Sequence, residues 1–366
     1  MKKIRNGIAI MQTVLLAFLL CSCAGNTDRA KNGVKITATD AKTEQTEEYN
    51  DAVFSMTIPK GWKVTCGGSD IYHSIRISDP DEPLNCMFVL LKADCLLHSQ
   101  EGKDAWKAVY NEGNRDAVIF ANAPVLEKPS TESFFKIFAQ YADMASKFEA
   151  AYVGYSFPHY DNFTVTDRFS GSGDMVKYSL GDEFLRATFT DNGRAGEGMF
   201  SASVVDFKES LYSDRTVADY GLESVDSGYY MAYNIVAITA AKDTFIEWED
   251  LLTECLKTLK YSDIFENNIR GAIERDFFQA RCINQNFNQT MDGIMSSWDS
   301  RNKSIDIISQ KQSDATLGYE RVYDTRTKEI YRAAKGFTSS YKGKGYKPVT
   351  DDNMYTTPIS GYIEKD

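Results

Sequence analysis

Three histidines, His73, His98 and His159, are the residues best suited to acid–base or metal chemistry near neutral pH. They are widely scattered along the chain, and no His-Glu-x-x-His zinc motif occurs. Cys95 lies three residues before His98, a spacing that would allow a thiol nucleophile beside a base. Because a catalytic thiol and its base are normally brought together from distant parts of the chain, we interpret the short spacing of Cys95 and His98 as a coincidence. We expect the histidines to have structural roles.

Other motifs that carry chemistry are incomplete. Residues 170–173, Ser-Gly-Ser-Gly, lack the Gly-x-Ser-x-Gly pattern of a nucleophile elbow, and we interpret them as a turn. The Lys-Gly-Lys-Gly run at 342–345 lacks the residue order of a phosphate-binding loop. Three carboxylates in the Pro-containing segment 79–83 lack the alternating ligands of a calcium loop. We therefore expect no catalytic residue, no metal site and no cofactor.

The chain contains seven cysteines without a Cys-x-x-Cys pair. This pattern makes a zinc site improbable. Cys66 and Cys86 fall in neighbouring strand-like segments, where an exported protein could join them by a disulfide. The alternative interpretation is that the cysteines of the folded part are buried free thiols that pack as small apolar side chains. Those cysteines are Cys66, Cys86, Cys95, Cys255 and Cys282.

The N-terminus has the features of an export signal. Three basic residues within the first five precede a short apolar run, Ile8 to Leu20, which is too short for a mature membrane-spanning helix. The run ends in Leu-Cys-Ser-Cys at 20–23, which resembles the bacterial lipoprotein signal, the lipobox. The resemblance implies cleavage after residue 22 and attachment of lipid, including acyl chains such as palmitate, to Cys23. The alternative is an ordinary secretory signal that is cleaved nearby.

The charge balance excludes one class of protein and constrains membrane attachment. The 366 residues include 41 Lys and Arg against 52 Asp and Glu, so a basic footprint for nucleic acid is lacking. From Cys23 onwards the counts are 38 and 52, a net charge of −14. Because anionic headgroups would repel such a chain, covalent lipid must hold it at the membrane. The polar stretch 23–50 is expected to be a disordered tether.

Alternating and helical patterns organise residues 51–261. Strand periodicity begins at residues 53–58 and returns at 62–66, 71–78, 85–92, 163–169, 176–178, 184–190, 199–205 and 229–240. Apolar residues at three- and four-residue steps predict helices over 102–112, 133–151 and 244–258. Ser130 and Ser133 are candidate N-caps of the second helix. The expected fold is an α+β sandwich built on an antiparallel sheet.

This order of features resembles the PsbP/Mog1-like family. The resemblance rests on the Ile-Pro-Lys-Gly-Trp entry at 58–62 and on the long strand and final helix at 229–260. It implies an α/β sandwich that usually works as a binding or assembly module.

Residues 262–366 are expected to form a smaller domain of helix and β-hairpins. Apolar residues between 269 and 298 follow a helical face, and hairpin material begins near 317. Tyrosines are dense in the last fifty residues, beside several lysines, and tyrosine suits stacking on sugars or anchoring a protein interface. The alternative is that tyrosine packs well on a half-buried sheet. The candidate binding surface comprises Tyr341, Tyr346, Tyr355, Lys342 and Lys344.

The sequence thus predicts an exported lipoprotein, anchored at the cell surface or the periplasmic face. It has a signal peptide at 1–22, a tether at 23–50, a sandwich at 51–261 and a smaller domain at 262–366. Its expected role is a non-enzymatic binding or assembly module at the cell envelope. Its expected partners are the lipid bilayer and an envelope protein or glycan, and not nucleic acid. The alternative is a cell-envelope hydrolase of unfamiliar type.

Overall fold

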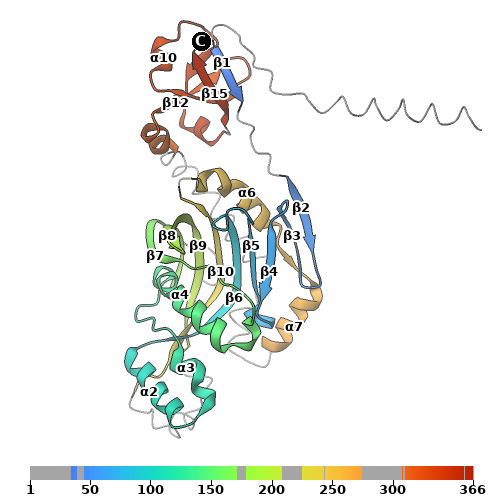
Figure 1. Cartoon of the computed structure of the whole chain (residues 1–366), viewed down its shortest axis with the longest axis vertical. Coiled ribbons are helices and arrows are strands. Elements are labelled where there is room, and N and C mark those ends of the chain that lie inside the picture. Colours follow the sequence, from blue (N-terminus) through green and yellow to red (C-terminus); the bar gives the residue numbers. More distant parts are fainter. Residues whose placement is uncertain are drawn as a thin grey trace, which may run out of the picture. The chain divides into compact units, whose positions relative to one another are not determined.

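The structure is a computed structural model that describes residues 34–38, 45–170, 179–207, 225–242, 244–273, 307, 310–357 and 359–365. The predicted signal peptide, Cys23 and Cys282 lie outside the described residues. So do the predicted strand at 176–178 and most of the helical face at 269–298. The chain divides into two compact units, residues 44–302 and residues 1–43 with 303–366 (Figure 1).

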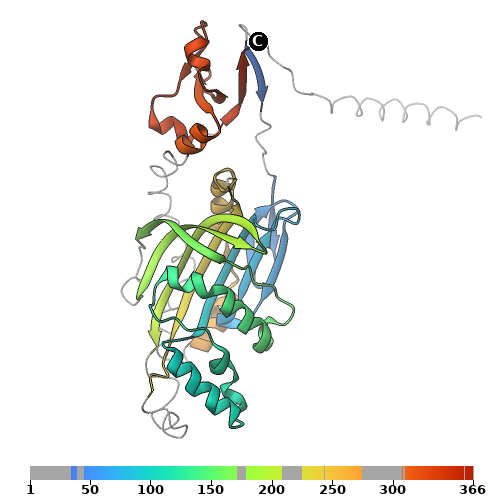
Figure 2. The same cartoon turned by 60° about the vertical axis from the view of Figure 1, so that its left-hand side comes forward.

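The larger unit contains a curved antiparallel sheet of seven strands (Figure 2). The alternating apolar residues predicted these strands, and each prediction that falls on described residues has a counterpart. Their spatial order is β4-β5-β6-β10-β9-β8-β7. Their bounds are β4 Lys63–Gly67, β5 Ser74–Ser78, β6 Cys86–Leu97, β7 Asp161–Ser170, β8 Gly181–Asp191, β9 Arg194–Phe207 and β10 Tyr229–Ala241.

Helix α4 (Thr131–Phe148) crosses one face of this sheet (Figure 2). Ser130 is its N-cap, and the Ser130 side chain accepts a hydrogen bond from the Ser133 N–H at 3.0 Å, as the sequence predicts for one of two candidates. The helix buries an aromatic stripe against alternate residues of β6, β8, β9 and β10. Members of this core include Phe134, Phe135, Phe138, Tyr141, Phe88, Leu90, Phe200 and Ile235.

A second, three-stranded sheet and helix α6 complete the sandwich. The sheet has the order β11-β3-β2, with β2 Thr46–Asn50, β3 Phe54–Pro59 and β11 Lys260–Tyr261. Helix α6 (Phe245–Lys257) contacts β3, β9 and β10, and its Trp248 packs on Trp62 with ring centroids 5.4 Å apart. Shorter elements are η1 Asp70–Tyr72, α2 Gln100–Asn111, η2 Arg115–Ala117, α3 Val118–Asn122, η3 Ala150–Tyr152 and α7 Asp263–Ile273.

The smaller unit is built on a five-stranded sheet in the order β1-β15-β13-β12-β14. Strands β13 and β15 pair in parallel, and the other neighbours pair antiparallel. Its core contains Val322, Tyr331, Ala333, Phe337 and Ile363. Its elements are β1 Val34–Ala38, β12 Tyr319–Asp324, β13 Ile330–Ala334, α10 Phe337–Ser340, β14 Tyr346–Pro348, η5 Asp352–Thr356 and β15 Ile359–Lys365.

The predicted α+β class is confirmed, with antiparallel sheets, helices and a smaller β-rich C-terminal region. The predicted tether at 23–50 includes two short strands, β1 and β2. Both strands gain backbone hydrogen bonds from partners elsewhere, β1 from β15 and β2 from β3, which offset their polar composition.

The predicted domain boundary near residue 261 also differs from the structure, in which the larger unit runs to 302. Helix α7 explains the difference, because its Phe265 stacks on Tyr261 with ring centroids 4.9 Å apart. The same Phe265 ring lies 5.1 Å from the His73 ring. These contacts bury the start of the predicted second domain against the first.

Candidate functional site

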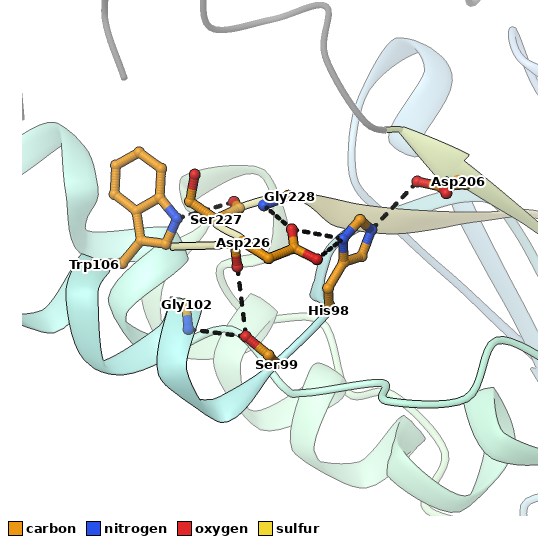
Figure 3. A network of polar contacts seen from close by, with 8 residues as sticks. All are labelled: His98, Ser99, Gly102, Trp106, Asp206, Asp226, Ser227 and Gly228. Carbon is orange, nitrogen blue, oxygen red and sulfur yellow. Dashed lines mark hydrogen bonds and ion pairs between the residues drawn. The ribbon is translucent and has the colours of Figure 1, made fainter. Parts of the chain in front are cut away.

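The chemistry-bearing side chains of the larger unit gather along the second half of β6. One group, the His98 network, comprises His98, Ser99, Gly102, Trp106, Asp206, Asp226, Ser227 and Gly228 (Figure 3). The other, the Lys92 cluster, comprises Lys92, Asp94, Tyr72 and Glu149. Each is built from parts of the chain that are distant in sequence.

The sheet topology brings His98 and Asp206 to the same end of the larger sheet. Strands β6 and β9 pair with the two edges of β10, so that Leu97 and Phe207 both lie opposite Tyr229. His98 directly follows Leu97, and Asp206 directly precedes Phe207. The two side chains therefore meet beside the first residues of β10.

The imidazole of His98 lies between two carboxylates (Figure 3). Its Nδ1 is 3.0 and 3.2 Å from the two oxygens of Asp226, and its Nε2 is 3.3 Å from Asp206 Oδ1. The ring also packs on Tyr230, with centroids 4.2 Å apart. Burial, and then the nearby carboxylates of Asp206 and Asp226, raise the pKa of the Tyr230 hydroxyl. Only 6% of the His98 side chain is exposed, so the ring is a packed part of the fold.

The segment that carries Asp226 is fastened to the start of helix α2 (Figure 3). Ser99 is the N-cap of α2 and accepts a hydrogen bond from the Gly102 N–H at 2.9 Å. The indole of Trp106 donates to the Ser227 carbonyl at 3.3 Å. Gly228 lies so close to His98 that an added Cβ would be 2.8 Å from His98 Cε1. These contacts hold the backbone of the segment, and the largely exposed Asp226 carboxylate accepts a hydrogen bond from the Gly228 N–H at 3.1 Å.

This geometry favours a structural role for the network. A histidine that acts as a general acid or base needs one ring nitrogen within reach of its substrate. In this network both ring nitrogens of His98 instead face carboxylate oxygens. Ser99 directly follows His98 in the chain, and the Ser99 hydroxyl caps helix α2. Cys95 packs instead in an apolar cluster with Leu97 and Trp106. Burial raises the pKa of the Cys95 thiol well above its ordinary value, the opposite of what a nucleophile needs.

The Lys92 cluster surrounds a fully buried ammonium. Lys92 Nζ lies 2.9 Å from Asp94 Oδ2 and donates to the Tyr72 hydroxyl oxygen at 3.3 Å. The Tyr72 hydroxyl in turn donates to Asp94 Oδ2 at 2.7 Å. Lys92 Nζ also lies 5.0 Å from the centroid of the Tyr72 ring. A buried ammonium needs such partners, because it loses its hydration on folding.

A β-bulge in β6 accompanies the cluster. The pairing register with β10 shifts between Tyr230 and Ala232, and Cys95 has a left-handed φ of 63°. A bulge changes the direction of side chains along a strand. Glu149, at the end of α4, faces the same group, and its pKa rises to about 7 because of burial first and the Asp94 carboxylate second. Two carboxylates and one ammonium thus share a single buried environment.

The remaining histidines lie apart from both groups. His73 is buried among the rings of Phe54, Tyr261 and Phe265, and burial lowers the pKa of its imidazole to about 4. His159 is more exposed, with Nε2 3.9 Å from Asp143 Oδ1.

Of the two alternatives for the cysteines, a disulfide or free thiols, the structure has free thiols at the described positions. Cys66, Cys86, Cys95 and Cys255 are all free, and Cys66 is exposed. Cys66 lies opposite Ile75 and Cys86 opposite Ser78, on the two sides of β5. Two strand spacings and three residues along the strand separate them by roughly 14 Å, beyond the ~7 Å limit for a disulfide.

The acidic segment 79–83 is a turn, and its acidic side chains form hydrogen bonds and an ion pair with other groups of the chain. Asp79 accepts hydrogen bonds from the Asp81 N–H and from the Asn85 side chain, and Glu82 pairs with Arg194. Among the residues that the structure describes, no group of three or more His, Cys, Asp or Glu side chains could hold a metal ion.

The predicted C-terminal binding residues fall into three environments. Tyr341 stacks on Phe337 at 5.2 Å between centroids and contacts Tyr346 at 5.8 Å, so both tyrosines pack partly into the core of the smaller unit. Tyr355 instead lies under the guanidinium of Arg321, which is 4.7 Å from its ring centroid. Lys342 and Lys344 are exposed. The structure therefore groups Tyr341 with Tyr346, and holds both by packing.

Sequence reasoning missed the Lys92 cluster and the two carboxylate partners of His98. One signal was present, because Lys92 and Asp94 are the charged residues of an otherwise apolar strand. Charged side chains in such a strand need buried partners. The partners Tyr72, Glu149, Asp206 and Asp226 lie 20 or more residues away, where spacing alone carries no signal.

Comparisons with known proteins give weak likeness to solved structures only. No protein-family model matches the chain, and no curated protein sequence matches it. Among solved structures, it is similar to the solution structure of cyanobacterial PsbP (CyanoP) from Synechocystis sp. PCC 6803. Identity is 11% and the TM-score 0.23, over 62% of this chain and 98% of that chain. The PsbP/Mog1-like family assignment stays a prediction. Within the described ranges, no helix combines the length and apolar character that a membrane span requires.

Proposed function

We propose that the chain is an exported, membrane-anchored lipoprotein that acts as a non-enzymatic binding or assembly module at the cell envelope. The anchor follows from the N-terminal sequence, in which a basic start and an apolar run lead to Leu-Cys-Ser-Cys at 20–23. Cys23 is the proposed lipid attachment site. Its thiol displaces the phosphate headgroup from the glycerol of a phospholipid, which forms the thioether and releases the headgroup phosphate and the thiol proton. Water then hydrolyses the Ser22–Cys23 peptide bond, and the freed Cys23 amino group takes an acyl chain from a second phospholipid.

One observation supports the non-enzymatic role. The titratable side chains that converge on β6 are bound to one another by short contacts, Lys92 to Asp94 and His98 to Asp226, and the Lys92 and His98 side chains are nearly or fully buried. Catalytic groups commonly reduce the stability of the fold that holds them, so replacing them tends to stabilise a protein. Groups bound in this way should stabilise it instead.

Metabolic labelling tests the anchor. Cells that produce the full chain are grown with labelled palmitate, and the wild type is compared with Cys23→Ala and with the matched control Cys21→Ala. We expect Cys23→Ala to lose the label and Cys21→Ala to keep it, because the two cysteines differ only in their place relative to the cleavage site. Equal labelling of all three chains would exclude the proposed attachment.

Unfolding measurements test the role of the buried groups. If His98 and Lys92 serve the fold, His98→Ala and Lys92→Met should each lower the midpoint of urea unfolding. If they serve catalysis, at least one of these substitutions should raise it. The surface substitution Lys128→Met, at an exposed position of the same unit, is the matched control.

A further inference from the structure

Charge is divided unequally between the two units. From Cys23 onwards, the smaller unit (residues 23–43 and 303–366) carries 15 Lys and Arg against 11 Asp and Glu, a net charge of +4. Residues 44–302 carry 23 Lys and Arg against 41 Asp and Glu, a net charge of −18. The net charge of the whole chain is therefore the sum of a weakly basic unit and a strongly acidic one.

Five exposed cations lie along one edge of the smaller sheet. We define the basic edge as Arg326, Lys328, Lys342, Lys344 and Lys347. The first two belong to the turn between β12 and β13, Lys342 and Lys344 to the segment that leads into edge strand β14, and Lys347 to β14 itself. The two segments touch, because the Thr325 N–H donates to the Gly345 carbonyl at 2.8 Å and Tyr323 lies opposite Lys347 in the sheet.

Two acidic residues of these segments, Asp324 and Glu329, lower the local charge from +5 to +3 without ion-pairing with the described basic edge. Asp324 accepts hydrogen bonds from the N–H groups of Arg326 and Thr327, which close the turn. Glu329 accepts hydrogen bonds from the hydroxyls of Thr327 and Tyr331. The ion pairs found in the described part of this unit join other residues, Lys311 to Asp352 and Asp314 to Arg321 and Arg332. The five cations thus remain available to an external anion.

Local packing gives this edge a fixed shape. Lys328 Nζ lies 5.3 Å from the centroid of the Tyr323 ring, a cation–π distance. The loop with Lys342 and Lys344 folds against the Tyr341 hydroxyl, where an added Cβ on Gly343 would lie 2.2 Å from that oxygen. The half-buried Tyr341 and Tyr346 therefore support the loop that presents the lysines.

The same unit contains the described strand that lies nearest to the proposed anchor. Ten residues separate Cys23 from Val34, the first residue of β1, and β1 pairs with β15 in the smaller sheet. Eleven residue steps span at most about 40 Å even when fully extended. A lipid on Cys23 would therefore hold the basic unit close to the bilayer.

We infer that the basic edge docks on the anionic headgroups of the membrane to which the chain is anchored. The inference rests on the proposed lipoprotein function and adds a second attachment to it. The diacylglycerol on Cys23 already supplies two acyl chains, and the basic edge adds an electrostatic attraction to anionic headgroups.

Vesicle sedimentation without the lipid anchor tests this inference. The chain from residue 23 with Cys23→Ala is mixed with phosphatidylcholine vesicles, with or without about one third phosphatidylglycerol. We expect binding to the anionic vesicles only, and its loss at about 1 M NaCl, where the Debye length falls to about 3 Å. Because each basic residue at an anionic surface strengthens partitioning roughly fivefold, the K342Q/K344Q/K347Q variant should bind at least tenfold more weakly.

Two controls make the outcome decisive. The K63Q/K128Q/K260Q variant removes three exposed lysines of the larger unit and should bind as the parent does. The K342R/K344R/K347R variant keeps the charges of the basic edge and should also bind. Equal binding to neutral and anionic vesicles, or an equal loss in both glutamine variants, would overturn the inference. The protein in the vesicle experiment carries no lipid, so a negative result there would not bear on the palmitate labelling of Cys23.

Discussion

The ammonium of Lys92 and the carboxylate of Asp94 lie 2.9 Å apart inside the larger unit, with the Lys92 side chain fully buried and the Asp94 side chain 16% exposed. The pair lies two residues apart on β6, beside the bulge that ends at Leu96. Tyr72 bridges the two charges through its hydroxyl. In a buried position, the attraction between the two charges offsets the cost of removing both from water. Removing one partner therefore leaves the other charge buried without compensation.

We predict that Lys92→Met lowers the free energy of unfolding by about 2–4 kcal/mol, because Asp94 then loses its counter-ion in a largely buried site. Adding Asp94→Asn should recover at least half of that loss, since the amide is neutral and still accepts a hydrogen bond from Tyr72. Urea unfolding of the two single variants and the double variant measures the coupling. Additive losses would show that the two side chains do not stabilise each other.

Glu149 should make the fold less stable as the pH rises. Its pKa is about 7 in the folded chain and 4.5 ordinarily, so the folded state holds the proton more tightly between these values. Stability contributed by the protonated group is therefore lost from about pH 4.5 to pH 7. Glu149→Gln stays neutral, and its advantage over the wild type should grow by roughly 1–3 kcal/mol across that window. Unfolding at several pH values checks this, and a constant difference would contradict it.

His73 should have the opposite effect. Burial lowers the pKa of its imidazole to about 4 from 6.5, so the unfolded chain binds a proton that the folded chain excludes. Stability is therefore lost as the pH falls from about 6.5 to about 4. His73→Phe keeps a ring against Phe54 and Phe265 and cannot be protonated. Its acid unfolding midpoint should lie below that of the wild type, and the exposed control His159→Phe should leave the midpoint unchanged.

Gly228 should tolerate no side chain. An added Cβ would lie 2.8 and 2.9 Å from atoms of the His98 ring, which is itself held between Asp206 and Asp226. Gly228→Ala should therefore destabilise the larger unit by about 1–3 kcal/mol. The neighbouring Ser227→Ala leaves the backbone carbonyl that accepts from Trp106 in place and serves as the control. Combining Gly228→Ala with His98→Ala should cost less than the sum of the two, and a strictly additive result would contradict the contact.

Local sequence patterns predict those helices and strands in which apolar side chains are buried on one face and polar side chains are exposed on the other. The alternation at residues 53–58 corresponds to β3, and the aromatic stripe after Ser130 corresponds to α4. Neither β1 nor β2 was predicted, because their formation depends on pairing rather than on composition. Val34 lies opposite Lys365, at the other end of the chain, and β2 is a polar edge strand. Local composition carries no record of such distant partners.

The site shows the same limit. Cys95 and His98 are three residues apart in the sequence, yet they belong to different environments in the fold. The bulge near Cys95 redirects the strand, and a bulge has no fixed sequence signature. The carboxylates around His98 come from β9 and from the segment before β10, so only the sheet order brings them together.

The central claim is that Cys23 becomes the lipid-bearing N-terminus of the mature protein. Mass spectrometry of the N-terminal peptide from membrane-extracted protein measures this most directly. We expect a peptide that begins at Cys23 and carries a thioether-linked diacylglycerol. A mature N-terminus at another residue, or an unmodified Cys23, would contradict it.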